Sequence, residues 1–319
     1  MCNFVPVMKH LIWLLSLCCL LQACGDSYEE TKRKNREERL RMAKEEAAAL
    51  KVAVLPTLDC LPLYLMKDHQ LYDTAVVDLR LKLFTAQMDC DTALLGTSAE
   101  GMVTDLVRAE RIAKGGVNMQ YIAATNAYWQ LVSNRNSRVR QLKSLEDKMV
   151  AMTRYSVTDM LTDLVVDSAK LKTEYVFRIQ MNDVHVRMQM LQNSIIDALF
   201  LTEPQATQAR MGKHPVILDT RKLNMHMGVV AFRSDRLRGE TRKRQMDEFV
   251  RAYNRACDSI NHYGVAHYRD LVMKYCRVKS EVVDSLPKDI KFPRADGPRQ
   301  PDVERADRWL QKLKADGAK

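Results

Sequence analysis

The sequence lacks the residue patterns that several large classes of functional site require. Its 8 cysteines and 7 histidines show none of the spacings typical of zinc or iron–sulfur ligands. No glycine-rich phosphate loop, nucleophile elbow or serine–histidine–aspartate order stands out. These absences argue against a metal centre, a bound cofactor and catalysis, so we expect no enzyme.

The net charge is positive, but the basic residues are not clustered. The formal net charge is +10, and the lysines and arginines are scattered along the chain. Aromatic residues make up only 7% of the sequence and do not interleave with basic clusters. Nucleic-acid binding is therefore not favoured. An anionic ligand or an acidic membrane surface remains compatible with the charge.

No hydrophobic run is long enough to span a membrane, but a shorter run stands at the amino terminus. Lys9 and His10 precede an apolar stretch over residues 11–21, which has about half the length that a membrane-spanning helix needs. Leu21-Gln22-Ala23-Cys24 then resembles a bacterial lipobox. We expect residues 1–23 to be a lipoprotein signal peptide and Cys24 to carry lipid. The alternative is an ordinary cleaved signal followed by an incidental cysteine.

Residues 24–50 are expected to form a charged tether. Seven acidic and seven basic side chains lie between residues 25 and 50, and almost nothing there is large and apolar. Glu29/Arg33 and Glu30/Lys34 have the spacing of helical ion pairs, each worth a few tenths of a kcal/mol. The segment is neutral overall, so it predicts a solvated, partly helical stalk and not a nucleic-acid arm.

After residue 50 the pattern alternates between strands and helices. Short strands are predicted at 51–55, 76–84, 92–95 and 121–124, and helices at 61–71 and 99–113, with Ser98 as the N-cap of the second. A second series has strands at 148–152, 175–179, 196–201, 216–218 and 228–232, and helices from about 157 and at 184–193. Helical segments at 240–263, 265–276, 279–285 and 302–315 complete the chain. This alternation is typical of an α/β fold.

The two series predict two lobes joined by two crossings. Residues 51–131 and 229–293 would form lobe 1, residues 132–228 lobe 2, and residues 294–319 a C-terminal tail with a helix. Such an architecture suits a ligand cleft between the lobes.

Four segments resemble a known family. They are Lys51-Val-Ala-Val-Leu-Pro56, Gly96-Thr-Ser-Ala-Glu-Gly101, Asp197-Ala-Leu-Phe-Leu-Thr-Glu-Pro204 and Gly228-Val-Val-Ala-Phe232. Together they resemble the periplasmic substrate-binding proteins of ABC importers, within the branch that binds thiamine-pyrimidine precursors, alkanesulfonates and nitrate. The resemblance implies a type II-like two-lobed fold, a monomer on the periplasmic side of the envelope, and an ABC permease with its ATPase as partners.

Ligands of such folds bind beyond the carboxyl ends of parallel strands, where helix N-termini present unpaired N–H groups. The residues expected there in lobe 1 are Asp59, Asp91, Thr97, Ser98, Asn126 and Tyr128. In lobe 2 they are Thr153, Arg154, Tyr155, Ser156, Asp183 and Glu203. For Ser98, Ser156, Asp183 and Glu203, a role confined to the first turn of their own helix stays open.

Arg154 indicates an anionic group on the ligand, because its guanidinium can bind a carboxylate, sulfonate or phosphate with two hydrogen bonds. An ion pair with Asp159 or Asp59 is the alternative. Acidic side chains at the mouth favour a ligand that also carries donors. We therefore expect a small polar organic molecule, heteroaromatic or of mixed charge, and no metal.

Two questions stay open from the sequence. Cys60 and Cys90 follow neighbouring predicted strands, so a disulfide between them is one possibility, and Cys257–Cys276 is another. The tether and the C-terminal helix also allow a lipoprotein that acts through a protein partner without any ligand.

Overall fold

The computed structural model describes residues 28–317, and it divides into two compact units at residues 49 and 50. In the first unit the described residues form helix α2 (Tyr28–Ala48), whose exposed ion pairs include Arg33–Glu37 at 3.8 Å and Arg41–Glu45 at 3.7 Å. The predicted signal peptide and Cys24 lie outside the described residues. None of the described helices is both long and apolar enough to cross a membrane.

The second unit contains two five-stranded sheets. The first has the order β2-β1-β3-β10-β4. Its strands are β1 (Leu50–Val54), β2 (Leu79–Leu83), β3 (Gly101–Asp105), β4 (Met119–Ala124) and β10 (Gly228–Arg233). Strands β2 and β3 run parallel to β1, whereas β10 is antiparallel to β3 and β4. The carboxyl ends of β1, β2 and β3 therefore lie at one edge of this sheet.

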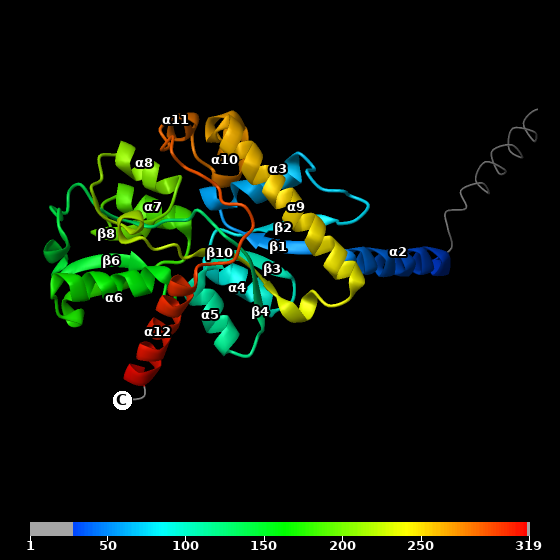
Figure 1. Cartoon of the computed structure of the whole chain (residues 1–319), viewed down its shortest axis with the longest axis horizontal. Helices are drawn as coiled ribbons and strands as arrows, with labels where there is room; N and C mark the ends of the chain where they lie inside the picture. Colours follow the sequence, from blue (N-terminus) through cyan, green and yellow to red (C-terminus); the bar gives the residue numbers. More distant parts are fainter. Residues whose placement is uncertain (1–27, 318–319) are drawn as a thin grey trace, which may run out of the picture. The chain divides into compact units, whose positions relative to one another are not determined.

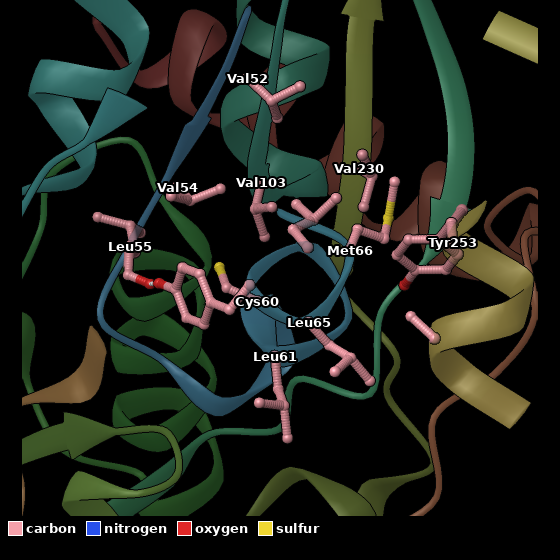
Figure 2. Close-up of a cluster of buried hydrophobic side chains, with 14 of the residues drawn as sticks. Val52, Val54, Leu55, Cys60, Leu61, Leu65, Met66, Val103, Val230 and Tyr253 are labelled. Carbon is pink, nitrogen blue, oxygen red and sulfur yellow. Dashed lines mark hydrogen bonds between the residues drawn. The ribbon is translucent and has the colours of Figure 1, made fainter. Parts of the chain in front are cut away.

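We call this sheet and the helices packed on it lobe 1 (Figure 1). Those helices are α3 (Leu61–Asp68), α4 (Gln87–Leu95), α5 (Leu106–Lys114), α9 (Glu240–Tyr263), α10 (Arg269–Cys276) and α11 (Ser280–Asp284). One cluster of buried apolar side chains joins strands β1, β3 and β10 to α3 and α9. Figure 2 shows part of it, with Val103 and Val230 of the sheet close to Met66 of α3 and Tyr253 of α9.

The second sheet, with its helices, forms lobe 2 and has the order β7-β6-β8-β5-β9. Its strands are β5 (Gln130–Ser133), β6 (Lys148–Met152), β7 (Val176–Gln180), β8 (Ala198–Leu201) and β9 (Val216–Asp219). Helices α6 (Val157–Ala169), α7 (Val184–Gln192) and α8 (Gln205–Met211) follow β6, β7 and β8. Strands β6, β7 and β8 are parallel, so their carboxyl ends also share one edge.

The chain crosses between the lobes at residues 125–129 and 220–227. Because β5 already begins at Gln130, residues 130–131 belong to the second sheet, and the predicted boundary after residue 131 falls inside a strand.

Helix α12 (Gln300–Gly317) contacts both lobes. Lys114 of α5 forms an ion pair with Asp307. Trp309 Nε1 donates a 2.7 Å hydrogen bond to Asp163 of α6. Ala306 and Trp309 are buried in an apolar cluster that contains residues of both lobes. Figure 1 shows α12 in red next to α5 and α6.

Two local predictions were wrong. Residues 92–95 are not a strand, because Gln87–Leu95 forms helix α4. Residues 99–105 do not begin a helix, because Gly101–Asp105 is the central strand β3, and α5 starts only at Leu106. Gly101 packs so closely on Phe232 of β10 that a Cβ there would lie 2.5 Å from the ring. The glycine at position 101 therefore suits a strand that packs closely on its neighbour, which the helical interpretation overlooked.

The structure contains no disulfide among the described cysteines. Cys60, Cys90, Cys257 and Cys276 are all buried free thiols. The predicted Cys60–Cys90 pairing assumed that both residues follow strands, but Cys90 lies within α4. Cys60 is part of the apolar core shown in Figure 2.

Candidate functional site

A cavity of about 70 Å³ lies between the two lobes. Lobe 1 contributes the segments that follow the carboxyl ends of β1, β2 and β3, and lobe 2 contributes those that follow β6 and β8, together with α7. The polar lining residues are Thr57, Asp59, Gln87, Thr104, Asp105, Trp129, Thr153, Ser156, Thr158, Arg187 and Thr202. Parallel strands in both sheets thus direct their carboxyl ends at the same space.

Asp59 is a buried carboxyl on the lobe 1 side of the cavity. It lies in the short 3₁₀ helix Leu58–Cys60, directly before α3, and is 8% exposed. Its Oδ2 accepts a 3.1 Å hydrogen bond from the Thr125 hydroxyl. Burial raises the pKa of Asp59, although the bonds from Thr57 and Thr125 oppose this effect.

Asp105 is a second buried carboxyl on the same side, at the end of β3. Its Oδ1 accepts the N–H of Arg108 at 3.1 Å and so caps helix α5. The same oxygen accepts the N–H of Val157 at 3.0 Å, in the first turn of α6 across the lobe boundary. Burial raises the pKa of Asp105 to about 6, despite the nearby Arg108 guanidinium.

Arg187 is the buried cation on the lobe 2 side. Its guanidinium reaches only neutral oxygens, at 3.3 Å from the Phe200 carbonyl, 3.3 Å from the Asn182 carbonyl and 3.4 Å from the Thr153 hydroxyl. The Nε is buried and has no hydrogen-bond partner. Burial lowers the pKa of Arg187 to about 10. Among residues 28–317, no carboxylate lies within ion-pair distance of this guanidinium.

Arg187 is held there by the apolar face of its own helix. Val184, Met188 and Leu191 are buried and occupy the positions three before, one after and four after Arg187. This spacing places all four side chains on one face of α7. The arginine therefore points inward with its apolar neighbours, and its methylene groups pack while its head meets the cavity.

Hydroxyl groups surround the N-terminus of α6. The Ser156 side chain accepts a 3.1 Å bond from the N–H of Thr158 and donates a 2.7 Å bond to the Thr153 carbonyl. The Thr158 hydroxyl accepts the N–H of Thr153 at 2.9 Å. These bonds fix the loop between β6 and α6 without help from a ligand.

Direct hydrogen bonds join the lobes on other sides of the cavity. The N–H of Val184 donates to the Thr85 carbonyl at 3.0 Å, and the N–H of Leu58 donates to the Glu203 carbonyl at 2.8 Å. Gln205 Nε2 donates to the Pro56 carbonyl at 2.8 Å. The lobes are therefore in contact around the cavity, as in a closed state.

Three of the predicted site residues line this cavity, namely Asp59, Thr153 and Ser156. Asp183 lies close by: it caps α7 and accepts a hydrogen bond from the Thr85 hydroxyl across the lobe boundary. Although burial acts in the opposite direction, these bonds lower the pKa of Asp183. Its role at the lobe contact was not foreseen.

Arg154 and its neighbours lie outside the cavity. The Arg154 side chain is exposed and rests 5.8 Å from the ring centre of Tyr155, which is itself 39% exposed. Neither predicted ion pair forms, since Asp159 pairs with Arg178 at 3.0 Å. Tyr155 has a positive φ of 56° in the loop 153–156, and both side chains are exposed.

Asp91 is a partner of Arg108 and does not line the cavity. Thr97 and Ser98 lie in the turn that precedes β3, at the edge of the sheet opposite the cavity. The Ser98 hydroxyl donates to the Ala93 carbonyl at 3.2 Å, so it closes α4 and caps no later helix. The misplaced helix at 99–113 explains why these two residues were expected at the ligand.

Asn126, Tyr128 and Glu203 lie by the first crossing. Asn126 and Tyr128 line a separate, more apolar cavity of about 370 Å³ beside residues 289–293. The Tyr128 hydroxyl donates a 2.7 Å bond to Glu203, which also accepts bonds from Thr207 and Arg210. The hydrogen bonds of the Glu203 carboxylate are thus all made with groups of the protein.

Sequence reasoning missed Arg187 and Asp105. For Arg187 a signal existed, namely a single arginine on the apolar face of a predicted helix. Asp105 was missed because it lies within residues 99–113, which were wrongly predicted to form a helix. Among the residues that the structure describes, no group of three or more histidine, cysteine or acidic side chains is arranged to hold a metal ion.

Comparison with solved structures identifies the fold. The chain superposes on the ligand-binding component of an ABC-type import system from Staphylococcus aureus, solved with zinc bound, with a TM-score of 0.69, 16% identity, and coverage of 84% of this chain and 92% of that one. The periplasmic aliphatic sulphonate-binding protein SsuA from Escherichia coli gives a TM-score of 0.66 and 17% identity, covering 83% and 92%. The periplasmic nitrate-binding protein NrtA from Synechocystis PCC 6803 superposes with a TM-score of 0.64 and 13% sequence identity. The match covers 80% of this chain and 74% of that protein.

No protein-family model and no curated protein matches the chain. At these identities the structural likeness establishes the fold: the second unit has the two-lobed α/β architecture of the periplasmic binding proteins, as the sequence resemblance predicted.

Proposed function

We propose that this chain is an extracytoplasmic solute-binding protein that captures a small polar molecule between its lobes and delivers it to an ABC importer. One observation carries the proposal: a cavity between the lobes is lined from both sides by the segments at the carboxyl ends of parallel strands. The similarity to import components from three bacteria supports it.

The geometry explains how the binding of a ligand would be signalled to the permease. A molecule in the cavity touches Asp59 and Asp105 in lobe 1 as well as Thr153, Ser156 and Arg187 in lobe 2. Because it contacts both lobes only when they are together, its binding free energy favours the closed state. A permease that binds the closed form would then distinguish loaded from empty protein. Such a function requires no catalytic group.

The chemistry of the lining favours an anionic or mixed-charge organic ligand. Arg187 takes the role that the sequence assigned to Arg154, since its Nε is buried without a partner. The predicted role of Asp59, Thr153 and Ser156 as ligand contacts is compatible with their positions. For the other predicted contacts, the cavity offers no support.

We further propose lipid anchoring through Cys24 on the periplasmic side of a bacterial membrane. This part rests on the lipobox-like Leu21-Gln22-Ala23-Cys24 and on the charged residues that follow it. The helix Tyr28–Ala48 suits a solvated stalk, because it has no buried residue of its own and carries ion pairs along its surface.

Native mass spectrometry of the full chain, extracted from membranes in mild detergent without refolding, tests the proposal. We expect a co-purified small mass of a single species, and a lipid-sized mass increase on the peptide that begins with Cys24. Protein with no bound molecule, and no thermal shift with any extract of small metabolites, would contradict solute binding. A protein subunit captured instead would favour the alternative of a lipoprotein that acts through a protein partner.

A further inference from the structure

We propose that the ligand is a compact zwitterion, whose ammonium group lies between Asp59 and Asp105 of lobe 1 and whose acidic group lies against Arg187 of lobe 2. This inference rests on the solute-binding function proposed above and names the chemical class of its ligand.

The first argument is the balance of charge around the cavity. In the part of the chain that the structure describes, neither Asp59 nor Asp105 forms an ion pair with a lysine or arginine, and Arg187 forms none with an acid. All three side chains are at least nine-tenths buried. Arg108, whose charge acts on Asp105, forms its own ion pair with Asp91. Buried charges without a directly paired counter-charge are costly, so the partners of these three groups are expected on the ligand.

The second argument concerns the free hydrogen-bonding capacity of Arg187. Its terminal nitrogens have contacts of 3.3–3.4 Å to neutral oxygens, near the long limit of a hydrogen bond, and its Nε has none. A carboxylate or a similar planar acid binds two nitrogens of a guanidinium at once. The closest acid in sequence, Asp183, is engaged by Thr85 and by the backbone of α7.

The third argument excludes the more usual anion site. A helix N-terminus attracts anions, and that of α6 borders the cavity. Here Asp105 accepts the N–H of Val157, and Ser156 accepts that of Thr158. The protein's own groups thus fill this position, so the acidic end of a ligand is directed to Arg187.

The fourth argument concerns the two carboxyls. Burial raises the pKa of both Asp59 and Asp105, because removal from water disfavours the ionised carboxylates that line the cavity. An ammonium group beside the two carboxylates would offset this penalty by its positive charge. A purely anionic ligand would instead face two acids.

Size sets the last limit. The cavity measures about 70 Å³, roughly half of the ~150 Å³ engineered cavity that holds benzene. In this closed state it admits a molecule with few non-hydrogen atoms. Glycine is the smallest amino acid that combines both charges, and β-alanine separates them by one more methylene group.

The experiment measures binding of matched probes to the full chain in detergent by calorimetry. The probes are glycine and β-alanine, with propionate lacking the amine and ethylamine lacking the acid. We expect at least one of the two zwitterions to bind at least tenfold more tightly than both single-charge probes. We also expect the species identified by native mass spectrometry to carry both charges.

Two variants locate the two ends of the ligand, and a third serves as the control. Arg187→Lys keeps the charge but not the planar geometry and should weaken zwitterion binding at least tenfold. Asp105→Asn keeps the acceptor for both helix N–H groups and should weaken it at least threefold. Arg154→Gln, which changes an exposed arginine outside the cavity, is the matched control and should leave affinity unchanged. Circular dichroism checks that each variant is folded.

The outcomes separate this inference from the function on which it rests. If the bound molecule or the preferred probe carries one charge or none, the zwitterion assignment is wrong and solute binding stands. If neither a co-purified molecule nor any probe binds, both are wrong. If the variants at Arg187 and Asp105 bind as the parent does, the assigned positions are wrong.

Discussion

Asp105 of lobe 1 accepts a hydrogen bond from the backbone N–H of Val157 in lobe 2, at 3.0 Å. The same carboxylate oxygen caps its own helix by accepting the N–H of Arg108 at 3.1 Å. One side chain therefore satisfies the first turns of two helices that belong to different lobes. Its environment also decides how the protein responds to pH.

Asp105 should make stability fall as pH rises from about 4 to 6. Its pKa is raised from 3.8 to about 6 by burial, so within this window the folded state holds more protons than the unfolded state. The full effect amounts to at most about 3 kcal/mol, given 1.36 kcal/mol per pKa unit and the two values above. The groups that act on it are Arg108, which opposes the shift, and Asp91, which adds to it.

Thermal unfolding of the parent and of Asp105→Asn between pH 4 and 8 measures this effect. The asparagine variant keeps an acceptor oxygen, so its curve should be flatter over the same window. Asp105→Ala removes the acceptor of both N–H groups together with the titration, so its cost relative to the parent should be largest near pH 4, at least about 1–2 kcal/mol, and should shrink as the pH rises to 6. Parallel pH profiles for the parent and the asparagine variant would contradict the assignment.

Arg154→Ala should change neither affinity nor stability by a measurable amount. The side chain is exposed, lies outside the cavity, and makes only a distant contact with an exposed ring. Surface contacts of this kind are usually worth less than about 0.5 kcal/mol. Calorimetry with the co-purified ligand tests this point, and a tenfold loss of affinity would restore the role that the sequence suggested for Arg154.

Glu203→Ala should destabilise the protein by about 3–5 kcal/mol, because it leaves Arg210 without its acid and removes acceptors for Tyr128 and Thr207. Tyr128→Phe removes one of these bonds and should cost about 1 kcal/mol. Urea unfolding of both variants gives the comparison. Glu203→Ala with unchanged stability but weaker ligand binding would show that this carboxylate serves the ligand instead.

Trp309→Ala should cost about 3 kcal/mol, because the ring is 8% exposed and packs in the cluster that includes residues of both lobes. Trp309→Phe keeps most of the packing and loses the 2.7 Å bond to Asp163, so about 1 kcal/mol is expected. Equal losses for the two variants would mean that packing contributes little here. Calorimetric unfolding distinguishes these cases.

The four described cysteines should resist thiol reagents until the protein unfolds. All are buried and free, and burial raises the pKa of Cys60, Cys90 and Cys276, so little thiolate forms at neutral pH. Peptide mapping after alkylation, with and without guanidinium, tests this. A Cys60–Cys90 disulfide recovered from oxidised protein would contradict the structure.

The sequence predicted the fold wherever periodicity was strong. The helix expected at 240–263 is α9 (Glu240–Tyr263), since its apolar residues repeat along one face. The strand 148–152 likewise coincides with β6. The helix expected at 99–113 failed because the short strand Gly101–Asp105 is buried on both faces and so has no alternation to mark it, and the good N-cap at Ser98 suggested otherwise.

The candidate site was harder to predict for a related reason. Strand order identifies which loops meet, and this brought Asp59, Thr153 and Ser156 to the cavity. It does not give the direction of a side chain within a loop, so Arg154 was chosen although its side chain is exposed and lies outside the cavity. Arg187 was overlooked because it comes one turn into a helix and not in a loop after a strand, although its place on the apolar face of that helix was a signal that it points inward.

If the protein binds a solute as we propose, helix α12 gives residues outside the cavity a share in ligand affinity. Because it contacts both α5 and α6, a motion that separates these helices must break its contacts with one of them. The fraction of empty protein that is already closed therefore depends on α12, and the apparent dissociation constant varies inversely with the binding-competent fraction. Substitutions along this helix can retune how tightly the protein holds its ligand while every residue at the cavity stays the same.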